Sequence, residues 1–256
     1  MSASYGGRGK LEGFDSGVRR VAPSFGKQLF LTYSEKADGT LVVESDSERF
    51  VAHMLTLDPN VSSFTTQPFT VDLIDRRICR TQADVEEARA RHRRLRGKKF
   101  YTPDFSVRWH LGGHVMTAVE VKLEGYEGNS DDMQRISIGR NIIESAGIEF
   151  LRIIWPKAQR NPLKANLPIL VKALRRVDLW PSAEMVQAVE SALESGVSTV
   201  RELCGALSLS PNLVPTLLVS GLIRGNVRDE LINGTMRIEP AYGDLGSLSL
   251  LRSLVQ

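Results

Sequence analysis

Residues 101–122 alternate between hydrophobic and polar positions in both halves of the segment. This period of two is typical of half-buried strands. In the first half the odd-numbered positions, beginning with Phe105, share one face, and the odd-numbered positions of the second half do the same. Gly112 and Gly113 stand between the halves, where a hairpin turn is needed. The pattern therefore predicts two antiparallel strands joined by a tight turn.

The opposite face of these strands carries the charges. Asp104, Glu120 and Lys122 are expected to converge at one end of the pair. Two carboxylates suit a hard divalent cation such as Mg²⁺, which prefers oxygen ligands. A lysine beside them can orient or deprotonate an attacking water and offset charge on a phosphate. Glu-x-Lys alone more often marks a solvated ion pair, but Pro103 ahead of the aspartate and the shared face favour a site.

The N-terminal third predicts a strand pair at 28–33 and 40–43, followed by a helix from about residue 46 to Leu57. Ser45 or Asp46 is the expected N-cap, and Asp58-Pro59 ends the helix. On this helix Glu48 falls on the apolar stripe. The expected polar face is formed by Ser45, Arg49, His53 and Thr56.

A carboxylate on the inward face of a helix is costly unless a metal ion or a lysine pairs with it. Glu48 is therefore a candidate site residue. The alternative is that Glu48 is an acid near a helix N-terminus, favoured by the helix dipole.

The middle of the chain predicts a strand at 67–73, an exposed basic helix at 83–96 and a helix at 130–145 capped by Ser130. Met133 is expected on the apolar side of the last helix, and 148–155 reads as a buried strand. The resulting order is helix, strand, strand, strand, helix, strand. We therefore expect an α/β fold with a mixed sheet flanked by helices.

Composition adds limits to this picture. A length of 256 residues with 42% hydrophobic content predicts one or two globular domains. There is no apolar run long enough to span a bilayer and no signal-peptide pattern, and the two cysteines carry no motif. We therefore expect a soluble cytoplasmic protein without a membrane partner, associated with the nucleoid when active.

The net charge is only +3, but seven basic residues without an intervening acid form one run ahead of residue 101. Such runs are usually solvated. Its position before the candidate site favours capture of the DNA backbone. The run, called here the basic run, comprises Arg89, Arg91, Arg93, Arg94, Arg96, Lys98 and Lys99.

The C-terminal part predicts helices at 164–177, 182–195, 199–207 and 212–221, then a hairpin turning at Asn233-Gly234. This order is a winged-helix-like pattern. The fourth helix, however, offers almost no side chain that reads bases, so we expect a core helix or a partner-binding face. The predicted divisions are a flexible arm at 1–26, a catalytic domain at 27–160 and a partner-binding domain at 163–256. The tail from 243 is either a docking element or frayed.

Pro103-Asp104 followed by Glu120-Val121-Lys122 resembles the PD-(D/E)xK nuclease signature, and the predicted element order resembles its restriction-endonuclease-like core. Further motifs resemble those of the TnsA transposon endonucleases over about residues 46–155. These motifs are Ser45-Asp46-Ser47-Glu48, Leu57-Asp58-Pro59-Asn60-Val61, Gln67-Pro68, Tyr101-Thr102-Pro103-Asp104-Phe105 and Glu120-Val121-Lys122.

The TnsA resemblance implies that Glu48, Asp104 and Lys122 are catalytic. It implies that Glu120, where some relatives carry glutamine, is catalytic as a metal ligand. Asp104, Glu120 and Glu48 would hold Mg²⁺, for which Mn²⁺ can substitute.

The same resemblance implies a subunit of a cut-and-paste transposition machine that cleaves the 5′, non-transferred strands at transposon ends. Its partners would be transposon-end DNA, a TnsB-type DDE integrase and a TnsC-type AAA+ regulator that binds the C-terminal domain. The alternatives are a stand-alone resolvase or restriction-type nuclease, and a catalytically inactive winged-helix DNA-binding regulator.

Overall fold

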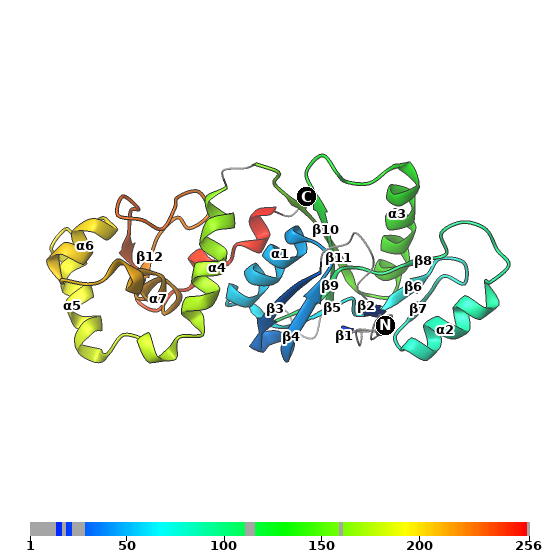
Figure 1. Ribbon diagram of the computed structural model, residues 1–256, viewed down its shortest axis with the longest axis horizontal. Helices are drawn as coiled ribbons and strands as arrows, with labels where there is room; N and C mark the ends of the chain where they lie inside the picture. The colour runs from blue at the N-terminus through cyan, green and yellow to red at the C-terminus, as the bar shows by residue number, and fades with distance from the viewer. Residues whose placement is uncertain (1–13, 17–18, 22–28, 111–115, 159–160, 255–256) are drawn as a thin grey trace, which may run out of the picture.

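The computed structural model describes residues 14–16, 19–21, 29–110, 116–158 and 161–254. It shows a mixed α/β protein with two lobes (Figure 1). One lobe contains most of the strands and the helices that flank them. The other contains most of the C-terminal helices.

The larger lobe is built on a four-stranded sheet in the order β11-β10-β9-β5. β9 (Phe105–Trp109) and β10 (Met116–Leu123) are antiparallel, with Phe105 opposite Val119. β5 (Val61–Thr66) pairs antiparallel with β9, and β11 (Glu149–Trp155) pairs parallel with β10. The predicted strand pair is thus confirmed, while the turn at Gly112 and Gly113 lies outside the described residues.

Two helices cover opposite faces of this sheet. α1 (Asp46–Leu57) packs on the face that carries Val119, and its Phe50 ring stacks on Trp155 at a centroid distance of 5.0 Å. α3 (Ser130–Ser145) packs on the other face. Ser45 caps α1 as predicted, whereas Asn129 rather than Ser130 caps α3. Both helices therefore begin close to where the sequence predicts.

The predicted polar face of α1 is wrong for His53 and Thr56, which are both buried. The reason is that β3 and α4 also pack on this helix. The Nε2 atom of His53 lies 3.1 Å from Thr32 Oγ1, and Thr56 Oγ1 donates to the carbonyl of Ala52. Burial, followed by the charge of Arg49, lowers the pKa of His53 to about 4.

The N-terminal part contains two small strand pairs. β3 (Phe30–Ser34) and β4 (Gly39–Val43) are antiparallel, as predicted, and the short 3₁₀ helix η1 (Glu35–Ala37) joins them. β1 (Phe14–Ser16) and β2 (Arg19–Val21) also pair. These six positions thus pair as strands inside the predicted arm, and the flexibility of the arm stays a prediction.

A small insertion separates β5 from β9. The predicted strand at 67–73 is broken because Gln67 has a positive φ of 45° and Pro68 follows it. β6 (Thr70–Asp72) instead forms a separate sheet, between β7 (Arg77–Cys79), which was not predicted, and β8 (Phe100–Tyr101).

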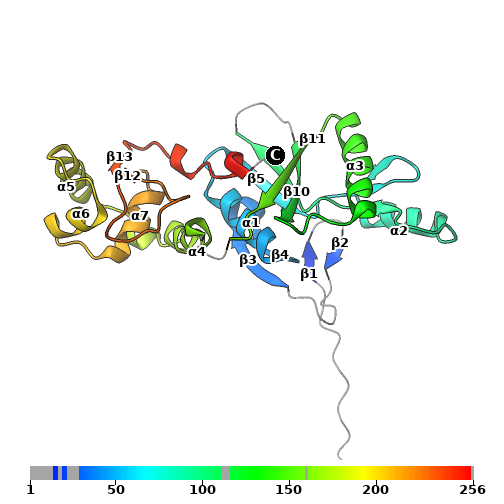
Figure 2. The same cartoon turned by 90° about the horizontal axis from the view of Figure 1, so that it is seen from above.

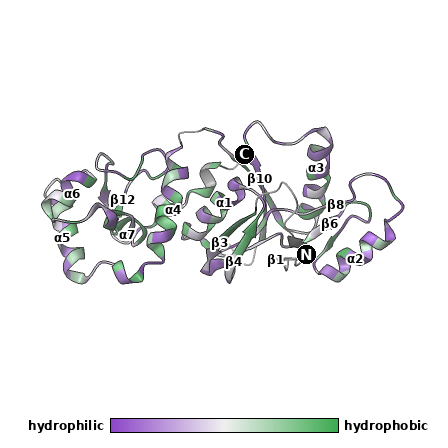
Figure 3. Cartoon of the chain, viewed as in Figure 1, coloured by the Kyte–Doolittle hydropathy of each residue, from purple (hydrophilic) through white to green (hydrophobic). Residues whose placement is uncertain are grey.

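α2 (Gln82–Arg91) completes the insertion and is strongly hydrophilic (Figure 3). It ends five residues before the predicted end at 96. The reason is that His92 turns inward and its Nε2 atom lies 2.8 Å from Asp72 Oδ2. On α3, Met133 is 48% exposed, contrary to the predicted apolar side.

The smaller lobe contains α4 (Pro162–Leu174), α5 (Ala183–Glu194), α6 (Val200–Ala206) and α7 (Val214–Val219). The 3₁₀ helix η2 (Val177–Leu179) follows α4, and η3 (Pro211–Leu213) precedes α7. All six residues of α7 are buried, and α7 packs against α4. The predicted fourth helix is therefore shorter than expected and belongs to the core.

The predicted tight hairpin at Asn233-Gly234 is wrong. β12 (Ile223–Arg224) and β13 (Glu239–Pro240) do pair, but each has two residues and a long loop separates them. The buried side chain of Asn166 holds this loop. Its Nδ2 donates to the carbonyls of Val227 and Glu230, and its Oδ1 accepts from a backbone N–H. Asn166 therefore ties the loop to α4, and the loop does not form the tight hairpin expected of a wing.

The tail returns to the larger lobe, beside the strands (Figure 2). It contains the 3₁₀ helices η4 (Gly246–Leu248) and η5 (Leu251–Leu254). Ser249 Oγ donates to Asp58 Oδ1 at 3.2 Å and accepts from Asn60 Nδ2 at 2.8 Å. These contacts hold the tail against the larger lobe, so it is not frayed over the residues that the structure describes, and its role in docking a partner stays a prediction.

A single hydrophobic core runs through both lobes, from Leu41 in β4 to Leu251 in the tail. α4 supplies the junction because it packs on α1 on one side and on α7 on the other. The predicted boundary near residue 160 therefore does not separate two independent cores.

Within the described residues, no single helix is both long and apolar enough to cross a membrane.

Candidate active site

Asp104 lies where the chain passes from β8 to β9. Its Oδ2 accepts a hydrogen bond from the backbone N–H of Val121 at 2.7 Å. Its backbone carbonyl accepts from the N–H of Gln67 at 2.9 Å. The carboxylate is therefore fixed against the middle of β10, between the positions of Glu120 and Lys122. This is the convergence that the alternating pattern predicts.

Glu120 is the most deeply buried acid of the group, with 3% of its surface exposed. Its Oε1 lies 2.5 Å from the Nζ of Lys122, on the same face of β10. Its Oε2 accepts a hydrogen bond from the hydroxyl of Tyr101 at 2.7 Å. Both oxygens of a buried carboxylate are thus satisfied.

Tyr101 and Gly139 are positioning residues to which the sequence analysis assigns no role. The Tyr101 ring lies directly against Gly139 of α3, where an added Cβ would be 2.3 Å from the ring carbon Cδ1. A glycine inside a helix costs stability and often has a packing reason. The signal available in the sequence was therefore an unexplained glycine in the middle of an otherwise regular helix.

Glu48 lies in the first turn of α1 and folds back over the N-terminus of the helix. Its Oε1 accepts from the hydroxyl of Ser45 at 2.7 Å, and its Oε2 accepts from the backbone N–H of Glu44 at 2.9 Å. The side chain thus stabilises the helix terminus, as the alternative interpretation holds. It also lies close enough to Glu120 for the two charges to interact, as the site interpretation requires.

The three carboxylates share one electrostatic environment. Burial, followed by the charges of Glu120 and Glu48, raises the pKa of Asp104 well above its usual value. Burial also raises the pKa of Glu48, although hydrogen bonds from Glu44 and Ser45 oppose that shift. These acids repel one another in a site of low dielectric constant. A cation between them would remove that cost.

Lys122 is the nearest cation. Burial acts to lower its pKa, but the charge and hydrogen bond of Glu120 outweigh burial and raise the pKa above the usual value. Lys122 is consequently an ammonium group at neutral pH. It is suited to donating hydrogen bonds and not to accepting a proton.

The donor set fits a hard divalent cation. Asp104, Glu120 and Glu48 offer only carboxylate oxygens, the ligand type that Mg²⁺ and Mn²⁺ prefer. The Oδ1 atom of Asp104 makes no hydrogen bond with any residue that the structure describes. The raised pKa values of Asp104 and Glu48 show that their anionic forms lack compensating charge.

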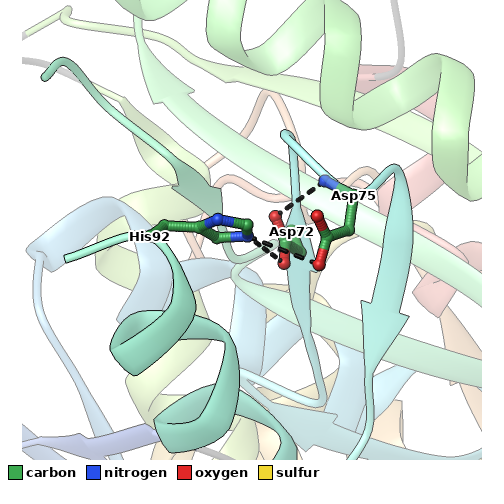
Figure 4. A group of neighbouring side chains, drawn as sticks. All are labelled: Asp72, Asp75 and His92. Carbon is green, nitrogen blue, oxygen red and sulfur yellow. Dashed lines mark hydrogen bonds and ion pairs between the residues drawn. The ribbon is translucent and has the colours of Figure 1, made fainter. Parts of the chain in front are cut away.

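A second acidic cluster lies in the insertion. In the described part of the chain, one group of three possible ligands has all its ligand atoms within 4.8 Å of one another, namely Asp72, Asp75 and His92 (Figure 4). Glu48, Asp104 and Glu120 do not form so close a group, because separate protein partners hold each of them.

The Asp72 cluster is already compensated by protein groups. Burial acts to raise the pKa of Asp72, but hydrogen bonds from the N–H of Asp75, from His92 and from the N–H of Ile74 bring it below the usual value. The Arg91 guanidinium lies 2.7 Å from Asp75. This network ties the end of α2 to the β6–β7 turn, and the anionic forms are stable there without a metal ion.

The basic run divides into two groups. Three of its members are engaged. Arg91 pairs with Asp75, Lys99 Nζ donates to the carbonyl of His92, and Lys98 Nζ lies 2.5 Å from Asp132 Oδ1. The other four are exposed and make no side-chain hydrogen bond or ion pair with any described residue: Arg89, Arg93, Arg94 and Arg96. Those four remain the better candidates for contacts with a polyanion.

Comparisons with known proteins add no relative. No protein-family model matches the chain, and no curated protein matches it. The candidate site therefore depends on its own geometry.

Replacing Gly139 with alanine should reduce the free energy of unfolding by about 1–3 kcal/mol, because the new methyl group would overlap the Tyr101 ring. Urea unfolding followed by circular dichroism measures this change. Gly205→Ala in α6 is the matched control, since nothing lies within 4 Å of its added Cβ. That control should be neutral or should gain up to about 1 kcal/mol from helix propensity. Equal effects of the two changes would contradict the role assigned to Gly139.

Asp104→Asn should raise the thermal unfolding midpoint at pH 7 in EDTA. A carboxyl group whose pKa is raised by folding costs stability once the pH exceeds its unfolded pKa, and the amide removes that cost. The gain should shrink as the pH falls and should vanish near pH 4, where the unfolded chain also protonates this group. Calorimetry across this range makes the measurement, with exposed Asp229→Asn as the control. A lower midpoint at pH 7 would show that Asp104 is stabilised as an anion.

Proposed function

We propose that this chain is a metal-dependent DNA endonuclease of the TnsA type, which cleaves the 5′ strands at transposon ends beside a DDE integrase. One observation carries the proposal. Asp104, next to β9, comes together with Glu120 and Lys122 on β10, and the charge of Glu48 in the first turn of α1 acts on Asp104. These four residues are the ones that the resemblance marks as functional.

The arrangement of elements supports the same proposal. α1, β5, β9, β10, α3 and β11 follow one another in the order expected of a restriction-endonuclease-like core. The parallel β10–β11 pair beside antiparallel β9 gives the mixed sheet that this core requires. The insertion of β6, β7, α2 and β8 leaves that order intact.

The chemistry assigned to the protein groups is positioning and charge stabilisation. Glu120 holds the Lys122 ammonium, whose remaining N–H groups can donate to an attacking water or to a phosphate oxygen. The Tyr101 hydroxyl donates a hydrogen bond to the other oxygen of Glu120. The Tyr101 ring packs directly against Gly139, which has no side chain to displace it. Lys122 thus orients the nucleophile and offsets the charge that develops on phosphorus. The raised pKa of Lys122 favours this role over that of a general base.

Asp104, Glu120 and Glu48 are the residues that would hold Mg²⁺, or Mn²⁺ in its place. When bound, the ion would supply Lewis-acid stabilisation and activate water. Asp104 is already oriented for this task by the N–H of Val121.

The smaller lobe supports a role in binding a protein partner such as a TnsC-type regulator. α7, which occupies the place of a recognition helix, is fully buried and cannot enter a DNA groove. Exposed apolar side chains occur instead on and after α4, at Ile169, Val177 and Trp180. Apolar groups of this size at the surface often mark protein contacts.

Cleavage of a supercoiled plasmid with Mg²⁺ or Mn²⁺, with and without the integrase and the regulator, tests the activity. Asp104→Ala should abolish nicking. Lys122→Ala should reduce its rate by roughly 10² or more while still binding the metal. Asp75→Ala is the matched acid control from the second cluster and should leave nicking unchanged.

If the Asp104→Ala variant still nicks the plasmid and the Asp75→Ala variant does not, the metal site lies in the insertion. Failure of the wild type with every partner would favour a catalytically inactive regulator. Cutting of four-way junctions by the chain alone would favour a resolvase.

The insertion products should report which strand is cut. An integrase frees the 3′ ends only, so Asp104→Ala should change simple insertions into joined donor–target molecules that replication resolves as cointegrates. Long-read sequencing of insertion products distinguishes the two forms. Simple insertions at the wild-type frequency would show that another site cuts the 5′ strands. Point variants are needed here, because deleting 163–256 would expose the buried face of α1.

A further inference from the structure

Two arginines near the candidate site have buried guanidinium nitrogens without acceptors. The Nε atom of Arg135, and both Nε and Nη2 of Arg152, are shielded from solvent and make no hydrogen bond with the described residues. A buried donor without an acceptor carries a free-energy cost, so each case calls for an explanation. Three such donors on two neighbouring elements show that protein acceptors satisfy these two guanidinium groups only in part.

Both arginines lie beside the Glu120–Lys122 pair. Arg152 on β11 is the cross-strand partner of Glu120 on β10, so the two side chains leave the same face of the sheet. Arg135 comes from α3, which packs on that face. Burial and then Glu120 have the largest effects on the pKa values of Tyr101 and Lys122. The positive charge of Arg135 acts to lower both pKa values, so Arg135 lies close enough to interact with both groups. The strand and the helix thus bring both guanidinium groups to the face of the sheet that carries Glu120.

Acids on the protein compensate these cations only in part. Arg135 Nη2 lies 3.2 Å from Asp132 Oδ1, but the same oxygen also lies 2.5 Å from the Nζ of Lys98. Arg152 Nη2 lies 3.5 Å from Glu127 Oε2 without forming a hydrogen bond. The side chains are 30% and 27% exposed, so a ligand in solution can reach part of each one, while the three nitrogens named above stay shielded. Positive charge therefore remains at the edge of the site.

We propose that Arg135 and Arg152 form a phosphate-binding subsite that holds the DNA backbone phosphates on either side of the bond to be cut. The inference rests on the proposed nuclease function and assigns the substrate contacts of the same site. A guanidinium fork matches two phosphate oxygens in a way that an ammonium cannot. Lys98, a member of the basic run, shares Asp132 with Arg135 and so connects the subsite to that run.

Arg140 provides the matched control. It lies on α3 as well, but its Nε atom donates to Glu144 Oε1 at 2.8 Å, and its side chain is 55% exposed. Arg140→Gln removes the same charge from the same helix without removing an unpaired buried donor. Its effect measures the general contribution of charge near the site.

The test is fluorescence anisotropy with a labelled DNA duplex, using the full chain and Ca²⁺ in place of Mg²⁺. Each phosphate contact contributes about 0.9 to the slope of log K against log salt concentration. Arg135→Gln and Arg152→Gln should each reduce that slope by about 0.9, and Arg140→Gln should change it much less. The proposal would be overturned if the slopes of Arg135→Gln and Arg152→Gln fall no further than the slope of Arg140→Gln. It would also be overturned if DNA binding by the wild type does not depend on salt concentration.

Lysine variants keep the test decisive if the glutamine variants fail to fold. Arg135→Lys and Arg152→Lys should keep the wild-type slope but bind several-fold more weakly, because the charge remains and the fork is lost. Wild-type affinity in both would overturn the subsite.

The outcome is separable from that of the nicking assay. If the wild type does not nick but the slopes fall as expected, the subsite stands and the nuclease proposal fails. If the wild type nicks and the slopes do not fall, the nuclease proposal stands and the subsite is wrong.

Discussion

The site depends on one buried carboxylate. Glu120 lies inside the sheet between Lys122 and Tyr101, and each of its oxygens has one partner. Removing either partner would leave a charged oxygen in a low-dielectric interior, at a cost of several kcal/mol. The requirement extends outward, because Tyr101 can reach Glu120 only where α3 carries a glycine. The close approach of α3 at Gly139 therefore leaves the Tyr101 ring the room it occupies beside Glu120.

The parts of this arrangement that are local in the chain were predictable. Alternation gives the strands and their faces, and the cap of α1 by Ser45 follows from a polar residue ahead of an apolar stripe. Asp104, Glu120 and Lys122 could be placed together because they lie on a hairpin, where register fixes neighbours.

The predictions that were wrong share one physical cause, which is contact between residues that are distant in the sequence. The end of α2 is set by His92 binding Asp72, and the conformation of the 225–238 loop is set by Asn166. The burial of His53 and Thr56 depends on α4, which begins more than a hundred residues later. Hydrophobic periodicity indicates which face of a helix is buried on average. It cannot show that a distant segment of the chain also packs on another face of the same helix. Tyr101 and Arg135 escaped notice for the same reason, since nothing in their own segments marks them as neighbours of Glu120.

The shared core has a consequence for how such a chain can evolve. The first turn of α1 carries Glu48, and its Asp46 lies 3.1 Å from the Nζ of Lys164 in α4. The tail adds a polar link through Ser249 to the loop that follows α1. Recombination that exchanged the smaller lobe between relatives would have to preserve both contacts and the α1–α4 packing. Replacing the smaller lobe alone would therefore break the α1–α4 packing and both polar contacts at once.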